Sequence, residues 1–277
     1  MFGWFKKEKE QEPLVQEELQ HNFNDHIAKE ILQDIKSEFG LDYAKQEYIT
    51  MRKIERFATK ESIYDFSKLK EQLVRSPKLK EQLINMLTVG ETYFYREKGH
   101  LTITQKLVEN EHVRRILCAP CSSGEEVYSI ALMLRSVGIS QSVHITGIDL
   151  NSDAITYAKR GCYSKRSLTY LPQELVNRYF AQEQERFCID NSLKVGTEFF
   201  HQNIFDESLS RLGSFDVIFC RNMLIYFDEE QKKDVIARLR KLLVPNGYLF
   251  VAHADIAFIP EGFKKVTAAE GSYFQLS

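Results

Sequence analysis

The sequence predicts an α/β fold: a parallel sheet covered by helices on both faces, preceded by a smaller domain made only of helices. After residue 101, segments of strand character alternate with helical segments, an order typical of parallel sheets. Before residue 88, apolar residues recur at helical spacing and no strand pattern occurs. The 277 residues also exceed the usual length of one domain, roughly 100–150 residues, so two cores are expected.

Composition narrows the class of protein. Apolar residues make up 43% of the chain, and 37 Lys and Arg nearly balance 39 Asp and Glu, for a formal net charge of -2. This charge excludes a globally basic nucleic-acid binder, so no nucleic acid is expected as a partner. No apolar run approaches the ~20 residues of a membrane span, and residues 1–7 are not followed by the apolar core of a signal peptide. We therefore expect a cytoplasmic protein.

The five cysteines form an odd, scattered set, which fits a reduced setting. Cys118 and Cys121 have the spacing of a metal-binding or redox pair. No second such pair and no nearby pair of histidines completes a zinc site, so we expect no metal.

Apolar spacing and capping residues predict four helices in the first part of the chain. Apolar residues recur at helical spacing from Ile27 to Phe39, and Gly40 follows where a C-terminal cap is expected. Ser76 followed by Pro77 is a helix start, with the serine as N-cap. The helices are expected at about residues 27–39, 46–58, 64–75 and 77–87.

The second part is expected to alternate strands with helices. The predicted strands are residues 115–119, 144–148 and 215–220, and the predicted helices are about residues 125–137, 152–160 and 229–243. Asn246-Gly247 predicts a turn before a late strand at 248–252, antiparallel at that end of the sheet, and a strand at 271–276 closes the chain. Residues 163–200 break this rhythm and are expected to hold an inserted helix and a small hairpin.

A loop of small residues, 119–124, joins the first strand to the helix that follows. Such a loop lets the backbone approach a ligand, and the helix N-terminus offers free N–H groups. It has a single glycine, and Glu125 and Glu126 at the helix start would repel a pyrophosphate. A cationic ligand, or one that offers hydroxyl and amino donors, suits these acids better. Alternatively, both simply favour the helix dipole.

Asp149 stands at the tip of the next strand, about 25 residues further on. In doubly wound folds, an acid at this place accepts hydrogen bonds from ribose hydroxyls. The alternative is that Asp149 caps the following helix, in competition with Asn151 or Ser152. The loop, the helix and the acid together favour a nucleoside without phosphates, for which S-adenosylmethionine is the obvious candidate.

Two further clusters are expected at the same crevice. Arg221, Asn222 and Tyr226 follow a buried strand, and ligands of such sheets lie beyond the C-terminal ends of the strands. Alternatively, Tyr226 and Phe227 pack under the sheet. The second cluster, residues 92–96, reads Thr-Tyr-Phe-Tyr-Arg at the junction of the two parts. It is either an apolar plug between them or a roof over the crevice, and the sequence leaves both open.

Together these clusters resemble the chemotaxis receptor methyltransferases, the CheR family, over nearly the whole chain from Phe23. The most specific marks are residues 92–96, residues 122–126 with 128–131, and residues 219–222 with 225–227. The resemblance implies a Rossmann-like, S-adenosylmethionine-dependent methyltransferase domain at 103–277, with a small β-subdomain inserted around 178–202. It also implies an N-terminal extension at 1–20, a helical receptor-recognition domain at 21–88 and a linker at 89–102 that contributes to the cofactor site.

The resemblance also implies the reaction and its residues. A methyl group passes from S-adenosylmethionine to glutamate γ-carboxylates on the cytoplasmic signalling helices of chemoreceptors, for sensory adaptation, and S-adenosylhomocysteine is left. Arg96 and Tyr226 are implied as the catalytic pair. Glu126, not separable from Glu125, would bind the amino-acid part of the cofactor and Asp149 its ribose. The implied cofactor-binding residues are Thr92, Arg96, Glu126, Asp149, Asn203, Ile204, Arg221 and Asn222, with Asn203 and Ile204 along the adenine.

Receptor binding is expected on the second helix, where Arg52, Lys53 and Arg56 fall near one face and complement acidic receptor helices. The alternative is a solvated basic face. Two features depart from the family. Gly90 stands where relatives commonly have asparagine, which removes one side-chain contact to the cofactor. The hairpin near residues 180–187 is shorter than in members that grip a receptor's C-terminal pentapeptide, so no such tether is expected.

Other functions compete with this interpretation. A protein that binds S-adenosylmethionine or S-adenosylhomocysteine without turnover could regulate a partner. A methyltransferase with a different substrate is nearer to the implied function. An NAD-dependent oxidoreductase is disfavoured by the single glycine, Gly124, and by the acidic helix start.

Overall fold

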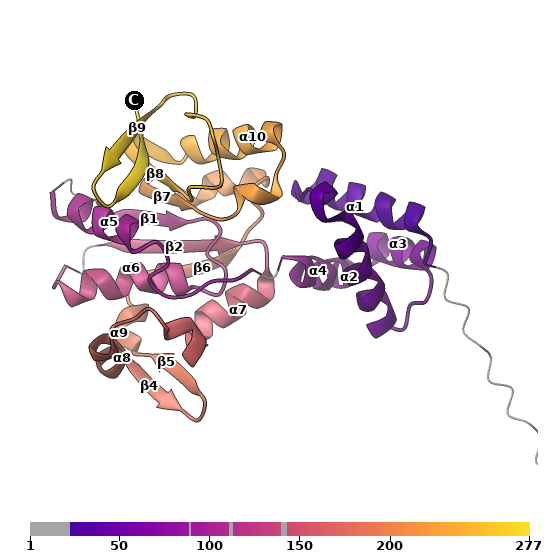
Figure 1. The fold of residues 1–277 in the computed structure, drawn as a ribbon, viewed down its shortest axis with the longest axis horizontal. Coiled ribbons are helices and arrows are strands. Elements are labelled where there is room, and N and C mark those ends of the chain that lie inside the picture. Colours follow the sequence, from indigo (N-terminus) through magenta and orange to yellow (C-terminus); the bar gives the residue numbers. More distant parts are fainter. Residues whose placement is uncertain (1–22, 89, 111–112, 140–142) are drawn as a thin grey trace, which may run out of the picture.

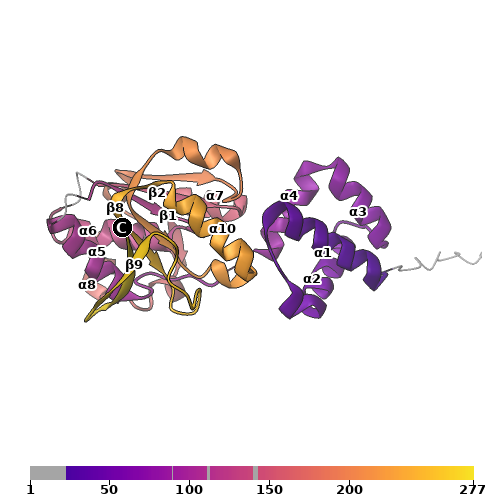
Figure 2. The same ribbon diagram turned by 90° about the horizontal axis from the view of Figure 1, so that it is seen from above.

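The computed structural model describes residues 23–88, 90–110, 113–139 and 143–277. The predicted extension at 1–20 lies outside these residues. The predicted fold class is confirmed: a mainly parallel sheet flanked by helices, a helical N-terminal region and a small antiparallel sheet. Figures 1 and 2 show the N-terminal helices as a separate lobe beside the sheet.

The helical lobe contains the four predicted helices. They are α1 (Asp25–Phe39), α2 (Glu47–Lys60), α3 (Phe66–Arg75) and α4 (Pro77–Leu87). Helix α1 ends where Gly40 adopts the left-handed conformation, with φ 74°, and donates its N–H to the carbonyl of Lys36. Ser76 caps α4 by accepting a hydrogen bond from the backbone N–H of Leu79 at 3.2 Å. Capping therefore set these ends as the sequence predicted.

The central sheet has the strand order β6-β2-β1-β7-β8-β10-β9. The first five strands in this order are parallel, and β10 runs antiparallel to both of its neighbours. The order reverses between β1 and β7, the place where open α/β sheets bind their ligands. The strands are β1 (Arg115–Cys118), β2 (His144–Asp149), β6 (Thr197–His201), β7 (Phe215–Cys220), β8 (Leu243–Val251), β9 (Phe263–Ala268) and β10 (Gly271–Leu276).

Four helices flank this sheet. They are α5 (Lys98–Asn110), α6 (Glu125–Ser136), α7 (Ser152–Arg160) and α10 (Glu229–Arg240). The sequence did not predict α5, which begins inside the predicted linker. Its second residue, Gly99, allows a close approach to the chain before β10, because a Cβ there would stand 1.9 Å from the carbonyl oxygen of Glu270.

Three predictions about the C-terminal part of the chain differ from the structure: the end of a helix, the place of a turn and the direction of a strand. The helix predicted at 229–243 ends at Arg240, since β8 already begins at Leu243. Asn246-Gly247 lies within β8 instead of before it, and β8 runs parallel to β7 with a register shift near Phe215. Asn246 has φ 62°, so the pair makes an irregularity in the strand where the sequence predicted a turn. The antiparallel direction belongs to β10.

The insertion between β2 and β7 contains a second sheet with the order β3-β5-β4. The expected hairpin is formed by β4 (Phe180–Glu183) and β5 (Arg186–Ile189), and β3 (Cys162–Ser164) pairs with the other edge of β5. Helices α8 (Gln173–Tyr179) and α9 (Asn191–Lys194) flank the hairpin in sequence. Figure 1 shows this unit projecting from one end of the main sheet.

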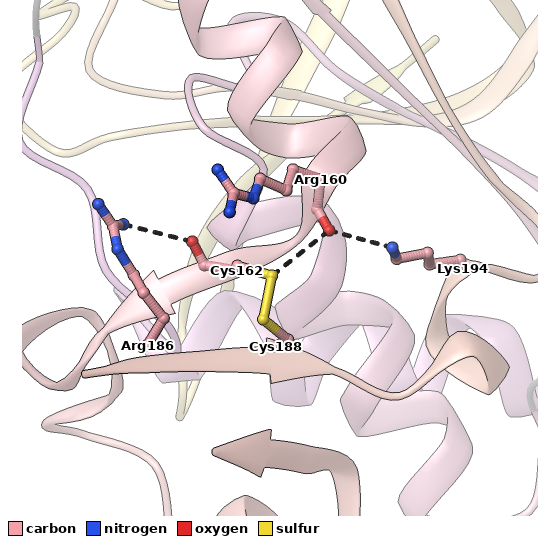
Figure 3. Close-up of a disulfide and its surroundings, with 5 residues drawn as sticks. All are labelled: Arg160, Cys162, Arg186, Cys188 and Lys194. Carbon is pink, nitrogen blue, oxygen red and sulfur yellow. Dashed lines mark hydrogen bonds between the residues drawn. A yellow bond between two sulfur atoms is a disulfide. The ribbon is translucent and has the colours of Figure 1, made fainter. Parts of the chain in front are cut away.

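Cys162 and Cys188 form a disulfide between β3 and β5, which the scattered cysteines did not predict (Figure 3). The two residues are directly opposite each other in the antiparallel pair. Nearby, Lys194 donates to the carbonyl of Arg160 at 3.0 Å. Cys118, Cys121 and Cys220 are free and buried, and burial raises the pKa of each thiol well above its usual range.

Reduction of this disulfide is expected to lower the thermal midpoint of unfolding. The bond closes a loop with a sequence separation of 26 residues, for which restriction of the unfolded chain contributes about 3 kcal/mol. Thermal scans of the wild type with and without reductant measure the effect. The Cys162→Ser/Cys188→Ser double variant is the control, and its midpoint should not respond to reductant. A wild-type midpoint that is equally insensitive would contradict the prediction.

The helical lobe is joined to the sheet domain by specific contacts. The Asp42 N–H donates to the carbonyl of Tyr226 at 2.8 Å, and Lys36 lies 3.0 Å from the Asp228 carboxylate. Asn85 donates to the Ser152 hydroxyl at 2.9 Å. These contacts hold the lobe against the C-terminal ends of the strands. Within the described residues, no helix is both long and apolar enough to cross a membrane.

Candidate cofactor site

A cavity of about 290 Å³ lies between the helical lobe and the C-terminal ends of the parallel strands. Every residue that the sequence analysis implied as cofactor-binding or catalytic is in its lining. These residues are Thr92, Arg96, Glu126, Asp149, Asn203, Ile204, Arg221, Asn222 and Tyr226. The topology explains this, because the loops after β1, β2, β6 and β7 all open at one edge of the sheet. Their individual roles remain predictions.

The loop after β1 separates the two glutamates at the start of α6. Glu125 is buried, accepts a hydrogen bond from the Ser123 hydroxyl at 2.7 Å, and is outside the cavity lining. Burial raises the pKa of its carboxyl group. Glu126 faces the cavity. The structure therefore presents Glu126, not Glu125, to a ligand.

Arg221 organises the acidic side of the cavity. Its side chain is only 2% exposed, and its Nε donates to the Glu126 carboxylate at 3.1 Å. Its Nη1 donates to the carbonyl of Arg96 at 3.0 Å and lies 3.4 Å from the Glu97 carboxylate. Because its donors are engaged by the protein, Arg221 fixes Glu126 and the backbone of Arg96 in place. Arg221 would therefore act on a ligand mainly by positioning Glu126 and the backbone of Arg96.

Asp149, at the end of β2, holds the loop that follows β1 through backbone hydrogen bonds. One carboxylate oxygen accepts from the backbone N–H of Ser122 at 2.7 Å and the other from that of Asn151 at 2.8 Å. The cap of α7 is Asn151, whose side chain accepts from Ala154 at 2.9 Å. The capping alternative for Asp149 is therefore excluded. Burial raises the pKa of the carboxyl group, and its remaining lone pairs can accept hydrogen bonds from ribose hydroxyls.

The apolar side of the cavity contains residues that the sequence analysis missed. Phe39, Leu41 and Tyr43 come from the lobe and line the cavity together with Ile204. Asn203 joins the two sides, because its amide donates to the carbonyl of Glu38 at 3.3 Å. Phe39 ends the apolar spacing of α1, and Leu41 and Tyr43 follow the Gly40 cap on either side of Asp42, so the sequence offered no signal that these residues face a cavity. An apolar slot with one amide beside it suits a purine ring.

Residues 92–96 do both things that the sequence left open: part of the segment is buried as an apolar plug, and part of it lines the cavity. Phe94 is fully buried and packs edge-on against Tyr163 at 4.9 Å between ring centroids. Thr92 and Arg96 line the cavity, and Arg96 donates to the carbonyl of Glu91 at 2.8 Å. The guanidinium of Arg96 also lies 5.7 Å from the centroid of the Tyr93 ring. Buried Phe94 thus anchors the segment that carries Arg96.

Tyr226 stands at the end of a short 3-10 helix (Leu224–Tyr226) after β7. Its carbonyl accepts the hydrogen bond from Asp42, so it stands where the sheet domain meets the lobe. Gly90 is also part of the lining, and a Cβ there would meet none of the described residues within 4 Å. A side chain at this position would therefore have room.

The predicted receptor-binding residues lie on the exposed face of α2. Arg52 and Arg56 line a shallow groove with Glu55 and Thr59, and Lys53 is exposed. Arg52 pairs with Glu55 and donates to the Tyr48 hydroxyl at 3.3 Å. None of the three is among the described residues that line the cofactor cavity.

The fold and the cavity define a nucleoside-binding α/β protein, and the residues present fit S-adenosylmethionine. Glu126 offers a carboxylate to an α-ammonium group, Asp149 offers acceptors to ribose hydroxyls, and Phe39 and Ile204 offer apolar surface to adenine. The phosphates of a nucleotide would instead be repelled by the carboxylates of Glu126 and Asp149.

Residues 90–271 match the family model described as CheR methyltransferase, SAM binding domain. The chain is 37% identical over 250 residues to a chemotaxis protein methyltransferase of Campylobacter jejuni, covering 89% of this chain and 94% of that one. A chemotaxis protein methyltransferase of Pseudomonas putida is 28% identical, with 83% and 90% covered. A probable biofilm formation methyltransferase of Pseudomonas aeruginosa is 27% identical, with 82% and 56% covered.

The chain therefore belongs to the CheR methyltransferase family. It is a methyltransferase, and S-adenosylmethionine is its cofactor.

Proposed function

We propose that this protein methylates glutamate γ-carboxylates on the cytoplasmic signalling helices of chemoreceptors and so serves sensory adaptation. The observation that carries the proposal is one cavity lined by all nine implied residues, with Arg96 and Tyr226 among them. The names of its curated relatives, chemotaxis protein methyltransferases, support the receptor as substrate. A receptor helix would meet the enzyme on the cytoplasmic side of the membrane.

The chemistry requires alignment more than activation. Bound S-adenosylmethionine supplies a methyl group on a sulfonium, which is an excellent leaving group. A glutamate carboxylate, with a pKa of about 4.3, is ionised at neutral pH and needs no general base. With the cofactor bound, attack by this oxygen would form the ester C–O bond as the S–C bond breaks, and the thioether would leave as S-adenosylhomocysteine. The protein has to hold the carboxylate in line and exclude water.

Arg96 and Tyr226 are proposed to do this. The Tyr226 hydroxyl can donate to the incoming carboxylate without removing its charge. Arg96 can attract it, but a tight ion pair would blunt the nucleophile. The hydrogen bond from Arg96 to the carbonyl of Glu91 and its contact with Tyr93 hold part of its donor capacity. We therefore assign Arg96 to cofactor organisation as well as to substrate alignment.

The other lining residues are proposed to hold the cofactor. Glu126 and Asp149 bind its amino-acid and ribose parts, and Asn203 and Ile204 line the adenine. Thr92 and Asn222 complete the pocket from its two sides. Arg221 contributes by fixing Glu126, since its Nε lies 3.1 Å from that carboxylate.

The decisive experiment incubates the protein with tritiated S-adenosylmethionine and purified receptor membranes, and scores base-labile methyl ester. Label in the receptor supports the proposal. Binding of the cofactor by calorimetry without any transfer would instead indicate a regulatory protein. Transfer to another protein would indicate a different substrate, an alternative favoured by the relative named for biofilm formation.

Receptor docking is proposed on α2, through Arg52, Lys53 and Arg56. The Arg52→Glu/Arg56→Glu variant should raise KM for receptor about tenfold and leave the affinity for cofactor unchanged, because rim charges steer an acidic partner. Steady-state kinetics with receptor membranes measure this. The Lys68→Glu/Lys78→Glu variant makes the same charge change on exposed positions of α3 and α4 and is the control. Equal losses in both variants would defeat the assignment.

We also propose that this enzyme does not use a receptor pentapeptide tether. The β4–β5 hairpin is short, with residues 184 and 185 between its strands. Titration of the protein with a receptor-tail peptide tests this, and micromolar binding would contradict it.

A further inference from the structure

Asp255 is a buried carboxyl group to which neither the sequence pattern nor the reaction assigns a role. It follows β8 and has no exposed surface. It lies beneath the segment that follows β7, which carries Arg221, Asn222 and Tyr226. Burying a carboxyl group is costly unless its hydrogen bonds compensate, so its partners show what it does.

Those partners are backbone N–H groups of the cavity wall. One carboxylate oxygen, Oδ2, accepts from Asn222 at 2.7 Å and from Ala252 at 3.2 Å. Asp255 thus ties the end of β8 to the start of the short segment that begins at Asn222 and leads to Tyr226.

The segment begins in a turn conformation that this bond fixes. Asn222 has φ 59°, in the left-handed region, which asparagine adopts more readily than other non-glycine residues. The other oxygen of Asp255, Oδ1, is buried and has no hydrogen-bond partner among the described residues. One oxygen of Asp255 thus stays unsatisfied while the other holds the backbone of Asn222, so the carboxyl group serves the neighbouring backbone.

The surroundings of Asp255 make the clamp sensitive to pH. Burial, and then the negative charge of Glu97, raise the pKa of Asp255 to about 6, against the lowering effect of its backbone hydrogen bonds. The Cys220 thiol faces it from the end of β7 and is kept neutral by its own burial. His253 is a near neighbour in the chain and is exposed. At pH 7.5 the carboxyl group is therefore ionised and its hydrogen bonds are charge-assisted.

We propose that Asp255 is a positioning residue, which holds Asn222 and the Tyr226-bearing turn in the geometry that cofactor binding and methyl transfer require. It acts through the backbone N–H group of Asn222 and does not line the cavity itself. The proposal rests on the proposed roles of Asn222 and Tyr226, and it predicts a measurable effect on cofactor affinity alone.

The test is calorimetric titration of S-adenosylhomocysteine into the wild type and the Asp255→Asn variant between pH 5.5 and 7.5. At pH 7.5 the variant should bind about tenfold more weakly, the loss expected for charge-assisted hydrogen bonds. The difference should shrink as the pH falls through about 6, because the wild-type carboxyl group then becomes neutral too. The Asp255→Glu variant, which keeps the charge, should recover part of the affinity.

Equal affinities at pH 7.5, or a ratio that stays constant across this pH range, would overturn the proposal, since packing alone gives no pH dependence. Asp216→Asn is the matched control, because Asp216 also accepts two backbone N–H groups, at the opposite end of β7. Its affinity should equal that of the wild type. If Asp255→Asn does not fold, Asp255→Ser takes its place with the same criteria. Because no receptor is present, failure of the receptor assay leaves this test intact.

Discussion

Replacing Glu126 with glutamine is expected to weaken the binding of S-adenosylmethionine and S-adenosylhomocysteine about a hundredfold, or about 2.7 kcal/mol. The substitution removes the charge that is proposed to face the cofactor's α-ammonium group. It also deprives buried Arg221 of the carboxylate that it contacts at 3.1 Å, which leaves Glu97 at 3.4 Å as its acidic partner. Breaking a buried pair from one side is costly because the other charge stays buried.

Isothermal calorimetry with S-adenosylhomocysteine measures this loss, and Glu125→Gln is the control. Glu125 precedes Glu126 directly, is buried and is bound to Ser123 outside the cavity lining. Its replacement should leave the affinity within about threefold of the wild type, since no contact to the ligand is lost. A large loss in Glu125→Gln with wild-type affinity in Glu126→Gln would reverse the assignment of the two acids.

The positions of the site residues could be predicted from the sequence because of a property of parallel sheets. Glu126, Asp149 and Asn222 are far apart in the chain, yet each follows the C-terminal end of a strand. Such ends meet at one edge of a parallel sheet, so strand prediction alone brings these residues together. The element bounds of α4 and α7 were predictable for a different reason: their caps, Ser76 and Asn151, act locally.

Other features depend on long-range packing and carry no such signal. Glu125 and Glu126 are adjacent on a helix, about 100° apart around its axis, and only the seating of α6 on the sheet decides which faces the cavity. Phe39, Leu41 and Tyr43 reach the cavity because the lobe docks there, through Lys36 and Asp228 among others. The sequence shows that these residues are apolar, but it does not show that they line the cofactor cavity.

The disulfide and the Asp255 clamp show the same limit. Cys162 and Cys188 become neighbours only when β3 pairs with β5, two strands too short to be recognised by periodicity. Asp255 acts on Asn222 across two strands that are adjacent in the sheet but separated in the chain by α10. Its residue type alone suggests a loop acid in solvent, whereas the structure buries it completely.

Replacing Tyr226 with phenylalanine is expected to lower kcat about thirtyfold, or about 2 kcal/mol, the contribution of a hydrogen bond to a charged reacting group. The substitution removes only the hydroxyl that is proposed to align the incoming carboxylate. The 3-10 turn and the hydrogen bond from the N–H of Asp42 to the backbone carbonyl of Tyr226 are kept. The affinity for S-adenosylhomocysteine should therefore change by no more than about threefold, because the ring still lines the cavity.

Single-turnover methylation of receptor membranes measures the chemical step, with Tyr43→Phe as the matched control. Tyr43 lines the same cavity, and burial, followed by the nearby Tyr226, raises the pKa of its phenol. Its hydroxyl already donates to the carbonyl of Leu87 at 3.3 Å, so it has no proton left for a substrate. If both variants lose the same activity, a general loosening of the cavity explains the result. A fall in Tyr226→Phe alone, at constant cofactor affinity, would identify the hydroxyl that orients the nucleophile.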